Sequence, residues 1–128
     1  MKFYIAARFD KRDEVKKLQN VLAEMGHEIV GDWTDHKPIK PYSENHDIAR
    51  DYASDDINGV KNADSFIILS DEAGTGMYVE LGAAIAANAL KGKPKIYAVG
   101  EHNSRSMFYF HPAVKRLSSV EDFFVEIR

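Results

Sequence analysis

Residues 65–99 decide the fold, and they read SFIILSDEAGTGMYVELGAAIAANALKGKPKIYAV. Two short apolar runs, Ser65 to Leu69 and Ile96 to Val99, enclose a segment of helical length from Gly76 to Lys91. The runs are continuous rather than alternating, which is typical of strands that are covered on both faces. This β-α-β unit therefore predicts a parallel sheet with helices packed on either side.

The same pattern continues toward both ends of the chain. Three more apolar runs have the length of strands: Phe3 to Ala7, Glu28 to Val30 and Val114 to Leu117. Three further segments read as helices, at about Arg12 to Met25, about Asn45 to Asn62 and after Ser118, where Ser118-Ser-Val-Glu121 matches a capping box. We expect one α/β domain over residues 1–128, a doubly wound, flavodoxin-like or Rossmann-like five-stranded parallel sheet of order 2-1-3-4-5.

Composition excludes several classes of function. The 128 residues are 45% hydrophobic and 29% charged, which suits a soluble globular chain. A net charge of -3 with scattered basic residues argues against a nucleic-acid polymer as partner. The chain has no cysteine and no histidine pair at a ligand spacing, so we expect no metal. The apolar start stops at Arg8, too soon for a signal peptide or membrane span, and we expect a cytoplasmic protein with no membrane partner.

In a doubly wound sheet, ligands bind at the carboxyl ends of the strands. The loop after the first strand begins Ala7-Arg-Phe-Asp10 and has no glycine, so it lacks the dinucleotide-binding fingerprint. The sequence also has no phosphate-binding P-loop. We therefore expect no cofactor.

Glu80 is the only carboxylate in an otherwise almost wholly apolar helix. A helix of that character is expected to be buried, where a carboxylate is costly unless it lies at a cleft or is paired. Its expected position in the first turn after Gly76 puts it near the positive end of the helix dipole, which favours the ionised form that a nucleophile needs. The alternative is an acidic residue that merely complements the helix terminus from solvent.

Asp56 lies within an apolar helical stripe, whereas its neighbour Asp55 lies outside it. The stripe consists of Ile48, Ala49, Tyr52, Ala53, Ile57 and Val60. A buried carboxyl of this kind is either held in a structural ion pair or used as an acid with an altered pKa. Together, Asp56 and Glu80 suggest the two groups that cleave a glycosidic bond with retention, a nucleophile and a second group that assists the leaving base.

Three segments carry a resemblance to a known family: Lys2-Phe-Tyr-Ile-Ala-Ala7, Asp56-Ile-Asn-Gly-Val-Lys-Asn-Ala-Asp64 and Gly74-Thr-Gly-Met-Tyr-Val-Glu-Leu-Gly82. In order and spacing they resemble the nucleoside 2-deoxyribosyltransferase family, which includes deoxynucleoside 5'-monophosphate N-hydrolases. The resemblance covers nearly the whole chain. It implies cleavage of the N-glycosidic bond of a small nucleoside or nucleotide.

The resemblance also implies roles for individual residues. Glu80 matches the nucleophile that forms a deoxyribosyl ester. Asp56 matches a carboxyl that contacts the sugar or the departing base, and Tyr4 matches the tyrosine that hydrogen-bonds the nucleophile. Asp71, or Glu72 in its place, corresponds to a further acid that handles the base. An ordinary strand tyrosine and solvated loop acids are the competing interpretations.

The remaining site residues follow from the same resemblance. Ala7, Arg8, Gly74, Gly76 and Met77 are expected to line the substrate site. The glycine-rich phosphate loop of the hydrolases is missing, which favours a nucleoside over a monophosphate, although Arg8 can pair with a phosphate. In the family a neighbouring subunit completes the site, which implies a homo-oligomer with Asn103, Ser104 or Ser106 reaching across. The competing interpretation of these three is as polar loop residues that face water.

Three functions stay open at this point: transfer of the sugar to a second nucleobase, its hydrolysis by water, and a non-catalytic nucleotide-binding module on the same fold. Transfer and hydrolysis differ only in the last step. The long segment Gly31 to Glu44 carries no periodicity and is either a flexible cover or a substrate lid.

Overall fold

Five parallel strands form one sheet in the order β2-β1-β3-β4-β5, which confirms the predicted fold class and strand order. The computed structural model describes all residues, 1–128. The strands are β1 (Lys2–Ala6), β2 (Glu28–Ile29), β3 (Ser65–Leu69), β4 (Lys95–Val99) and β5 (Val114–Leu117).

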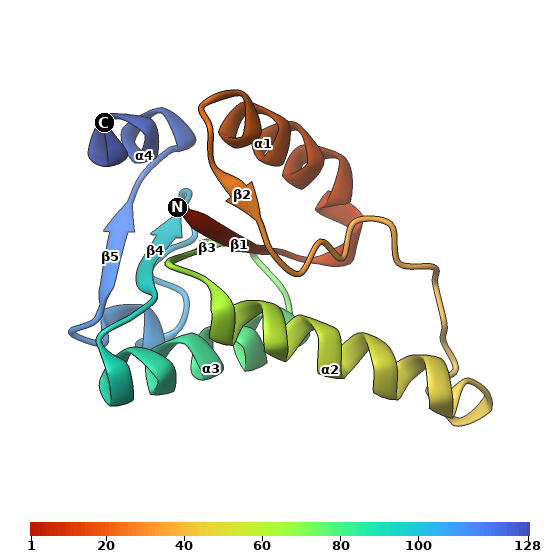
Figure 1. Cartoon of the computed structure of the whole chain (residues 1–128). Helices are drawn as coiled ribbons and strands as arrows, with labels where there is room; N and C mark the ends of the chain where they lie inside the picture. The colour runs from red at the N-terminus through yellow and green to blue at the C-terminus, as the bar shows by residue number, and fades with distance from the viewer.

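Helices cover both faces of the sheet, α1 and α4 on one side and α2 and α3 on the other (Figure 1). They are α1 (Arg12–Glu24), α2 (His46–Asn62), α3 (Gly76–Lys91) and α4 (Val120–Ile127). Three short 3-10 helices lie in the connections: η1 (Phe9–Lys11), η2 (Tyr42–Glu44) and η3 (Met107–Phe110). None of the helices combines the length and the apolar character needed to cross a membrane.

The pleat of β1 decides which of its side chains face which helices. Phe3 packs edge-on against Phe123 of α4, with ring centroids 6.1 Å apart. Because side chains alternate along a strand, Tyr4 points to the opposite face, toward α2 and α3. Its ring stacks on that of Phe66, its partner in the β1–β3 register, with centroids 5.8 Å apart. Tyr4 is thereby buried at the centre of the sheet beneath α2 and α3.

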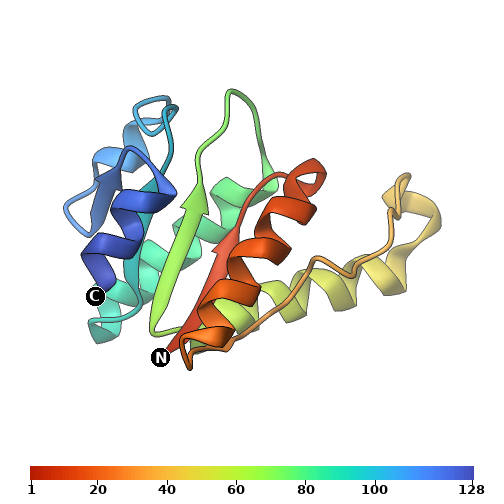
Figure 2. The same ribbon diagram turned by 90° about the horizontal axis from the view of Figure 1, so that it is seen from above.

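Two helices are less buried than the sequence suggests. The predicted burial of α3 on all sides is wrong, because Val79 is 66% exposed and Leu90 is 88% exposed. The apolar stripe of α2 is also exposed at its start, at Ile48. The N-terminal half of α2 projects past the edge of the sheet, so no core lies beneath it (Figure 2).

The last helix begins one residue later than the capping box implies. Ser119, not Ser118, is the N-cap, and its hydroxyl accepts a hydrogen bond of 3.1 Å from the backbone N–H of Asp122. The extended backbone of Ser119 and the acidic first turn of α4 are what a helix start requires.

The segment from Gly31 to Glu44 runs along the outside of the molecule to the far end of α2 (Figure 2). Its start is fixed to the core, since the indole N–H of Trp33 donates to the carbonyl oxygen of Ile5 at 2.6 Å. Farther along, the ring of His36 stacks on that of Tyr52 of α2, with centroids 3.7 Å apart. Lys16 also pairs with Asp32 at 2.8 Å, and the backbone N–H of Lys37 donates to the hydroxyl of Tyr52 at 3.1 Å, so the segment is held at several points against the body that carries the predicted site.

Candidate active site

Tyr4 and Glu80 meet between the sheet and α3. The hydroxyl of Tyr4 donates a hydrogen bond to Oε2 of Glu80. Burial and the neighbouring carboxylates of Glu80 and Asp56 raise the pKa of Tyr4, so its hydroxyl keeps its proton and stays a donor. The contact predicted for these two residues is present in the structure.

The surroundings of Glu80 differ from those expected for a residue at a helix terminus. Glu80 is the fifth residue of α3 and lies beyond the first turn, where the dipole acts most strongly. The pKa of Glu80 is raised to about 8, and burial is the largest cause. The hydrogen bond from Tyr4 lowers this pKa, whereas the negative charge of Asp56 raises it. The expectation of a dipole-stabilised carboxylate is therefore wrong, because desolvation dominates.

Asp56 lies on α2 close enough to this pair for its charge to act on both members. It is half-buried, and its Oδ1 has no hydrogen-bond partner. Burial, with a smaller effect from Asp55, raises the pKa of Asp56 to about 6. None of the ion pairs in the structure includes Asp56, so the interpretation as a structural ion pair is wrong. What remains is an acid with an altered pKa.

A hollow of about 620 Å³ opens between α2 and the segment that follows β2. Its lining is polar and acidic: Lys2, Val30, Gly31, Asp32, His36, Asp55, Asp56, Asn58, Gly59 and Asn62. Asp56 lines this hollow, whereas Glu80 does not. The two carboxyls thus approach each other from different helices, with Asp56 nearer to the open space.

Asp71 lies after β3 and pairs with two cations of the loop after β1. Its Oδ1 is 3.5 Å from Nη1 of Arg8, and its Oδ2 is 3.4 Å from Nζ of Lys11. Burial alone would raise the pKa of Asp71, but Lys11, a backbone N–H and Arg8 together hold it below its usual value. Asp71 is ionised at neutral pH, so it can accept hydrogen bonds and hold the cations, but it cannot donate a proton. Glu72 is exposed next to it.

The loop before α3 contains the glycines of the resemblance. Gly74 has a φ of +139°, and a Cβ placed there would lie 2.6 Å from Cε of Met77. Met77 is buried beneath this turn and belongs to the core. A Cβ on Gly76 would meet no atom within 4 Å, so the start of α3 is open to an approaching ligand. Ala7, at the end of β1, is buried.

The loop after β4 holds Asn103 and two serines. The side-chain amide of Asn103 donates to the carbonyl oxygen of Leu117 at 2.9 Å, which ties the loop to β5. Ser106 caps η3 by accepting a hydrogen bond from the backbone N–H of Phe108. Of the three residues, Ser104 is the one that is exposed and makes no hydrogen bond with its side chain.

Sequence reasoning missed three residues near the site: Lys11, Gly31 and Gly59. Lys11 follows Arg8 by three positions in a short 3-10 helix, a spacing that places both cations on one side. Gly59 lies within α2, three positions before its last residue, and glycine inside a helix is unfavourable relative to alanine by about 1 kcal/mol. A glycine in such a position signals a close approach of other atoms, and that signal was available in the sequence.

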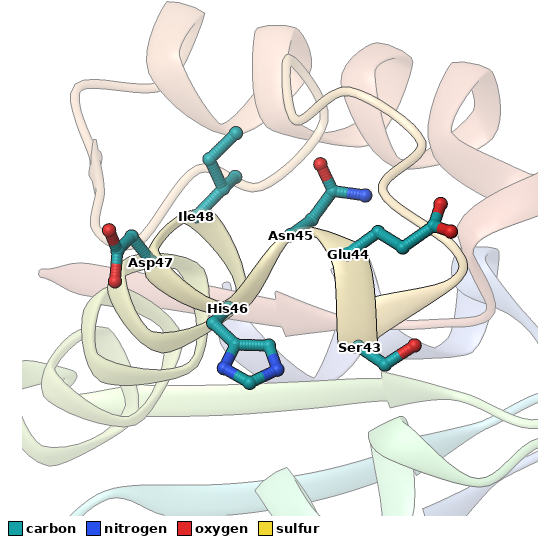
Figure 3. A pocket seen from close by; sticks show the side chains of 6 residues that line it. All are labelled: Ser43, Glu44, Asn45, His46, Asp47 and Ile48. Carbon is teal, nitrogen blue, oxygen red and sulfur yellow. The ribbon is translucent and has the colours of Figure 1, made fainter.

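A second hollow, of about 420 Å³, lies at the start of α2, away from these residues (Figure 3). One continuous stretch forms it, Ser43 to Ile48, and the side chains in Figure 3 point in different directions rather than toward a common centre. It lacks the convergent polar groups of a binding site.

Comparison with known proteins gives one informative likeness. No family model matches the sequence, and no curated protein matches it. Among solved structures, the fold is similar to that of a CMP N-glycosidase, BcmB, of Clostridium botulinum, with a TM-score of 0.59 and 18% identity over 99% of this chain and 97% of that one. At this identity the likeness shows the fold.

Proposed function

We propose that the protein cleaves the N-glycosidic bond of a 2'-deoxyribonucleoside through a covalent deoxyribosyl-Glu80 intermediate and transfers the sugar to another nucleobase. The observation that carries the proposal is the group of buried Tyr4 and half-buried Glu80 and Asp56, in which Glu80 receives a hydrogen bond and Asp56 lines an open hollow. Strongly shifted pKa values of two carboxyls in one site are typical of acid and nucleophile pairs.

The reactive form is the minor one of the two singly protonated forms of the pair, with Glu80 ionised and Asp56 protonated, because the pKa of Glu80 is about 8 and that of Asp56 is about 6. In the first step, the ionised oxygen of Glu80 in this form attacks C1' of the sugar. The C1'–N bond breaks, its electron pair stays on the base nitrogen, and the protonated carboxyl of Asp56 supplies the proton to the leaving base. Tyr4 keeps its own proton and orients the attacking carboxylate. The product is a deoxyribosyl ester of Glu80 and a free base.

In the second step, a nitrogen of another base attacks C1' and the ester C1'–O bond breaks, which restores the Glu80 carboxylate. Asp56 takes up the proton that the incoming base loses. Water in place of the second base gives hydrolysis and free sugar. The partial burial of Glu80 favours the transfer, because it limits the access of water to the ester.

Incubation of the protein with a deoxynucleoside and a second free base tests the proposal. We expect exchanged nucleoside in the wild type and none in Glu80→Gln, which keeps the shape of the side chain but removes the nucleophile. Free sugar without exchange indicates a hydrolase. Binding without turnover indicates the non-catalytic module, and turnover in Glu80→Gln contradicts the mechanism.

A trapping experiment identifies the nucleophile directly. A 2-fluoro-2-deoxy nucleoside slows breakdown of the ester, so the sugar mass stays on the protein. We expect that mass on the peptide that contains Glu80. A label on Asp56 or Asp71 instead would reassign the nucleophile.

A deoxynucleoside 5'-monophosphate is the second candidate substrate. Arg8 and Lys11 lie beside each other at the carboxyl end of β1, both only partly covered, and a guanidinium with an ammonium suits a phosphate. A similar fold occurs in an enzyme named for a nucleoside monophosphate. Against this, Asp71 already neutralises part of their charge, which favours the nucleoside.

We also propose a homo-oligomer in which a neighbouring subunit helps to complete the site. The exposed apolar side chains of α3 and η3 support it, because such a group is typical of subunit interfaces. They are Val79, Leu90, Met107, Phe108 and Phe110. The two elements lie next to each other, since Tyr78 and Tyr109 pack with ring centroids 5.7 Å apart. Ser104, on the same loop as η3, is the residue most open to a partner.

A further inference from the structure

Two glycines from separate parts of the chain abut one edge of the Tyr4 ring. Gly31 begins the segment after β2, and Gly59 lies in the last turn of α2. A Cβ on Gly31 would lie 2.6 Å from Cε2 of Tyr4, and a Cβ on Gly59 would lie 2.9 Å from Cδ2 of the same ring. Real Cβ atoms do not approach other atoms this closely, so either side chain would displace the ring.

The glycines also touch each other. A Cβ on Gly59 would lie 2.7 Å from Cα of Gly31, so the backbone of the segment crosses the backbone of α2 at this point. Gly31 has a φ of +63°, a conformation that residues with side chains rarely adopt. Both positions therefore require glycine, Gly31 for its backbone conformation and both for the space beside Tyr4.

The ring has little freedom to move away from this crossing. One of its faces stacks on Phe66 of the neighbouring strand, and Phe66 is fully buried. The hydroxyl at the end of the ring donates to Glu80. A shift of the ring edge thus carries the hydroxyl away from the carboxylate that it orients.

We propose that Gly31 and Gly59 are positioning residues, which set the Tyr4 ring so that its hydroxyl holds the Glu80 carboxylate. The catalytic meaning of this contact rests on the proposed function. The effect of the contact on the Glu80 carboxyl does not depend on that function and can be measured in the protein without substrate.

Titration of the Glu80 carboxyl by carbon-13 NMR tests the proposal in the full chain. Gly59→Ala is expected to move the midpoint of Glu80 upward by about one pH unit, because the hydrogen bond that favours the ionised form is lost. Tyr4→Phe is expected to produce the same shift. Gly82→Ala is the matched control, since a Cβ at that helical glycine meets no atom within 4 Å, and it should leave the midpoint unchanged.

The double variant distinguishes positioning from a merely structural role. If Gly59 acts through the Tyr4 hydroxyl, Gly59→Ala adds nothing to the shift already produced by Tyr4→Phe. A folded Gly59→Ala protein with the wild-type midpoint, or two shifts that simply add, would overturn the proposal. These readouts need no turnover, so a failure of the proposed enzymatic activity is distinguishable from a failure of this inference.

A measurement on the wild-type protein covers the case in which Gly59→Ala does not fold. A ring that is packed along one edge by two backbones flips slowly, so the two edges of Tyr4 should give separate NMR signals. The exposed ring of Tyr42 should give averaged signals and serves as the control. Averaged signals for Tyr4 at 25 °C would show a mobile ring and overturn the proposal.

Discussion

Tyr4 of β1 and Glu80 of α3, 76 positions apart in the sequence, share a hydrogen bond in which the tyrosine hydroxyl donates to the glutamate carboxylate. The sheet fixes one partner and the helix packed on it fixes the other. The bond therefore orients the proposed nucleophile without any contribution from a mobile loop, and it gives the first of the following predictions.

Removal of the hydroxyl should slow catalysis without abolishing it. Tyr4→Phe loses a hydrogen bond to a charged group, which corresponds to a decrease in kcat of about 10- to 100-fold. Initial rates of base exchange check this, and KM should change little because Tyr4 touches the nucleophile rather than the substrate. An unchanged kcat would show that Glu80 does not depend on Tyr4.

The rate should depend on pH with two limbs. The mechanism needs one proton on the pair of carboxyls, and this proton must be on Asp56. The pKa values are about 6 for Asp56 and about 8 for Glu80, so the proton resides mostly on Glu80 and the reactive form is a minor fraction of the singly protonated protein. Below the lower value both carry protons and no nucleophile is present, whereas above the higher value both are ionised and no acid is present. We expect a bell-shaped profile of kcat/KM with its maximum near neutral pH. Asp56→Asn should flatten the profile, and a wild-type rate that still rises above pH 9 would contradict this assignment.

Glu80→Gln should be more stable than the wild type at neutral pH. The pKa of Glu80 is raised from 4.5 to about 8 in the folded protein, so over that range the unfolded chain releases a proton that the folded protein keeps. The contribution of Glu80 to stability therefore falls as pH rises through this window. At pH 7 the raised pKa of Glu80 lowers the free energy of unfolding by roughly 3 kcal/mol. Glutamine does not titrate, so Glu80→Gln avoids this loss. Urea unfolding at pH 7 and pH 4 measures the effect, which should vanish at pH 4, and an equal gain at both values would point to another cause.

Arg8→Ala should separate the two candidate substrates. For a monophosphate, the lost guanidinium should raise KM by about 10-fold or more, whereas kcat/KM for the nucleoside should stay nearly unchanged. Arg12→Ala is the matched control, since this arginine is exposed and lies over the ring of Phe9 rather than beside Asp71. A similar loss for both substrates would place Arg8 away from any phosphate.

A charge on the exposed face of α3 should disrupt the proposed oligomer. Leu90→Glu is expected to convert the assembly to the 14.5 kDa monomer in sedimentation experiments, because a carboxylate would be buried in the apolar interface. Val125→Glu is the control, because Val125 is also exposed but lies on α4, on the other side of the sheet. A monomeric wild type would contradict the interface.

The order of elements was predictable because it depends on local patterns. The runs Ser65 to Leu69 and Val114 to Leu117 coincide with β3 and β5, and the predicted helix from Gly76 to Lys91 coincides with α3. Short connections and right-handed crossovers then leave few strand orders. Exposure was not predictable in the same way, since Leu90 has the same local pattern as a buried residue and lies outside the core only because no element covers it.

For the candidate site, the sequence indicated the residue types but not their electrostatics. Asp56 was expected to be buried and its neighbour Asp55 exposed. In the structure Asp56 is half-buried with a raised pKa, and Asp55 is exposed. The pKa of Glu80 depends on the sheet beneath it and on Tyr4, both distant in sequence, so helix position alone gave the wrong direction. The pairing of Asp71 with Lys11 is another such long-range relationship.

The indole of Trp33 on Ile5 and the imidazole of His36 on Tyr52 fix the first part of the segment after β2. Hydrogen bonds from Lys37 to Tyr52 and from Asn45 to Ile39 attach the rest of it to the start of α2. Residues 37–41 connect His36 to η2. None of these residues lines the hollow beside Asp56, whereas Gly31, Asp32 and His36 do, so an insertion in this stretch would leave the lining of the hollow intact.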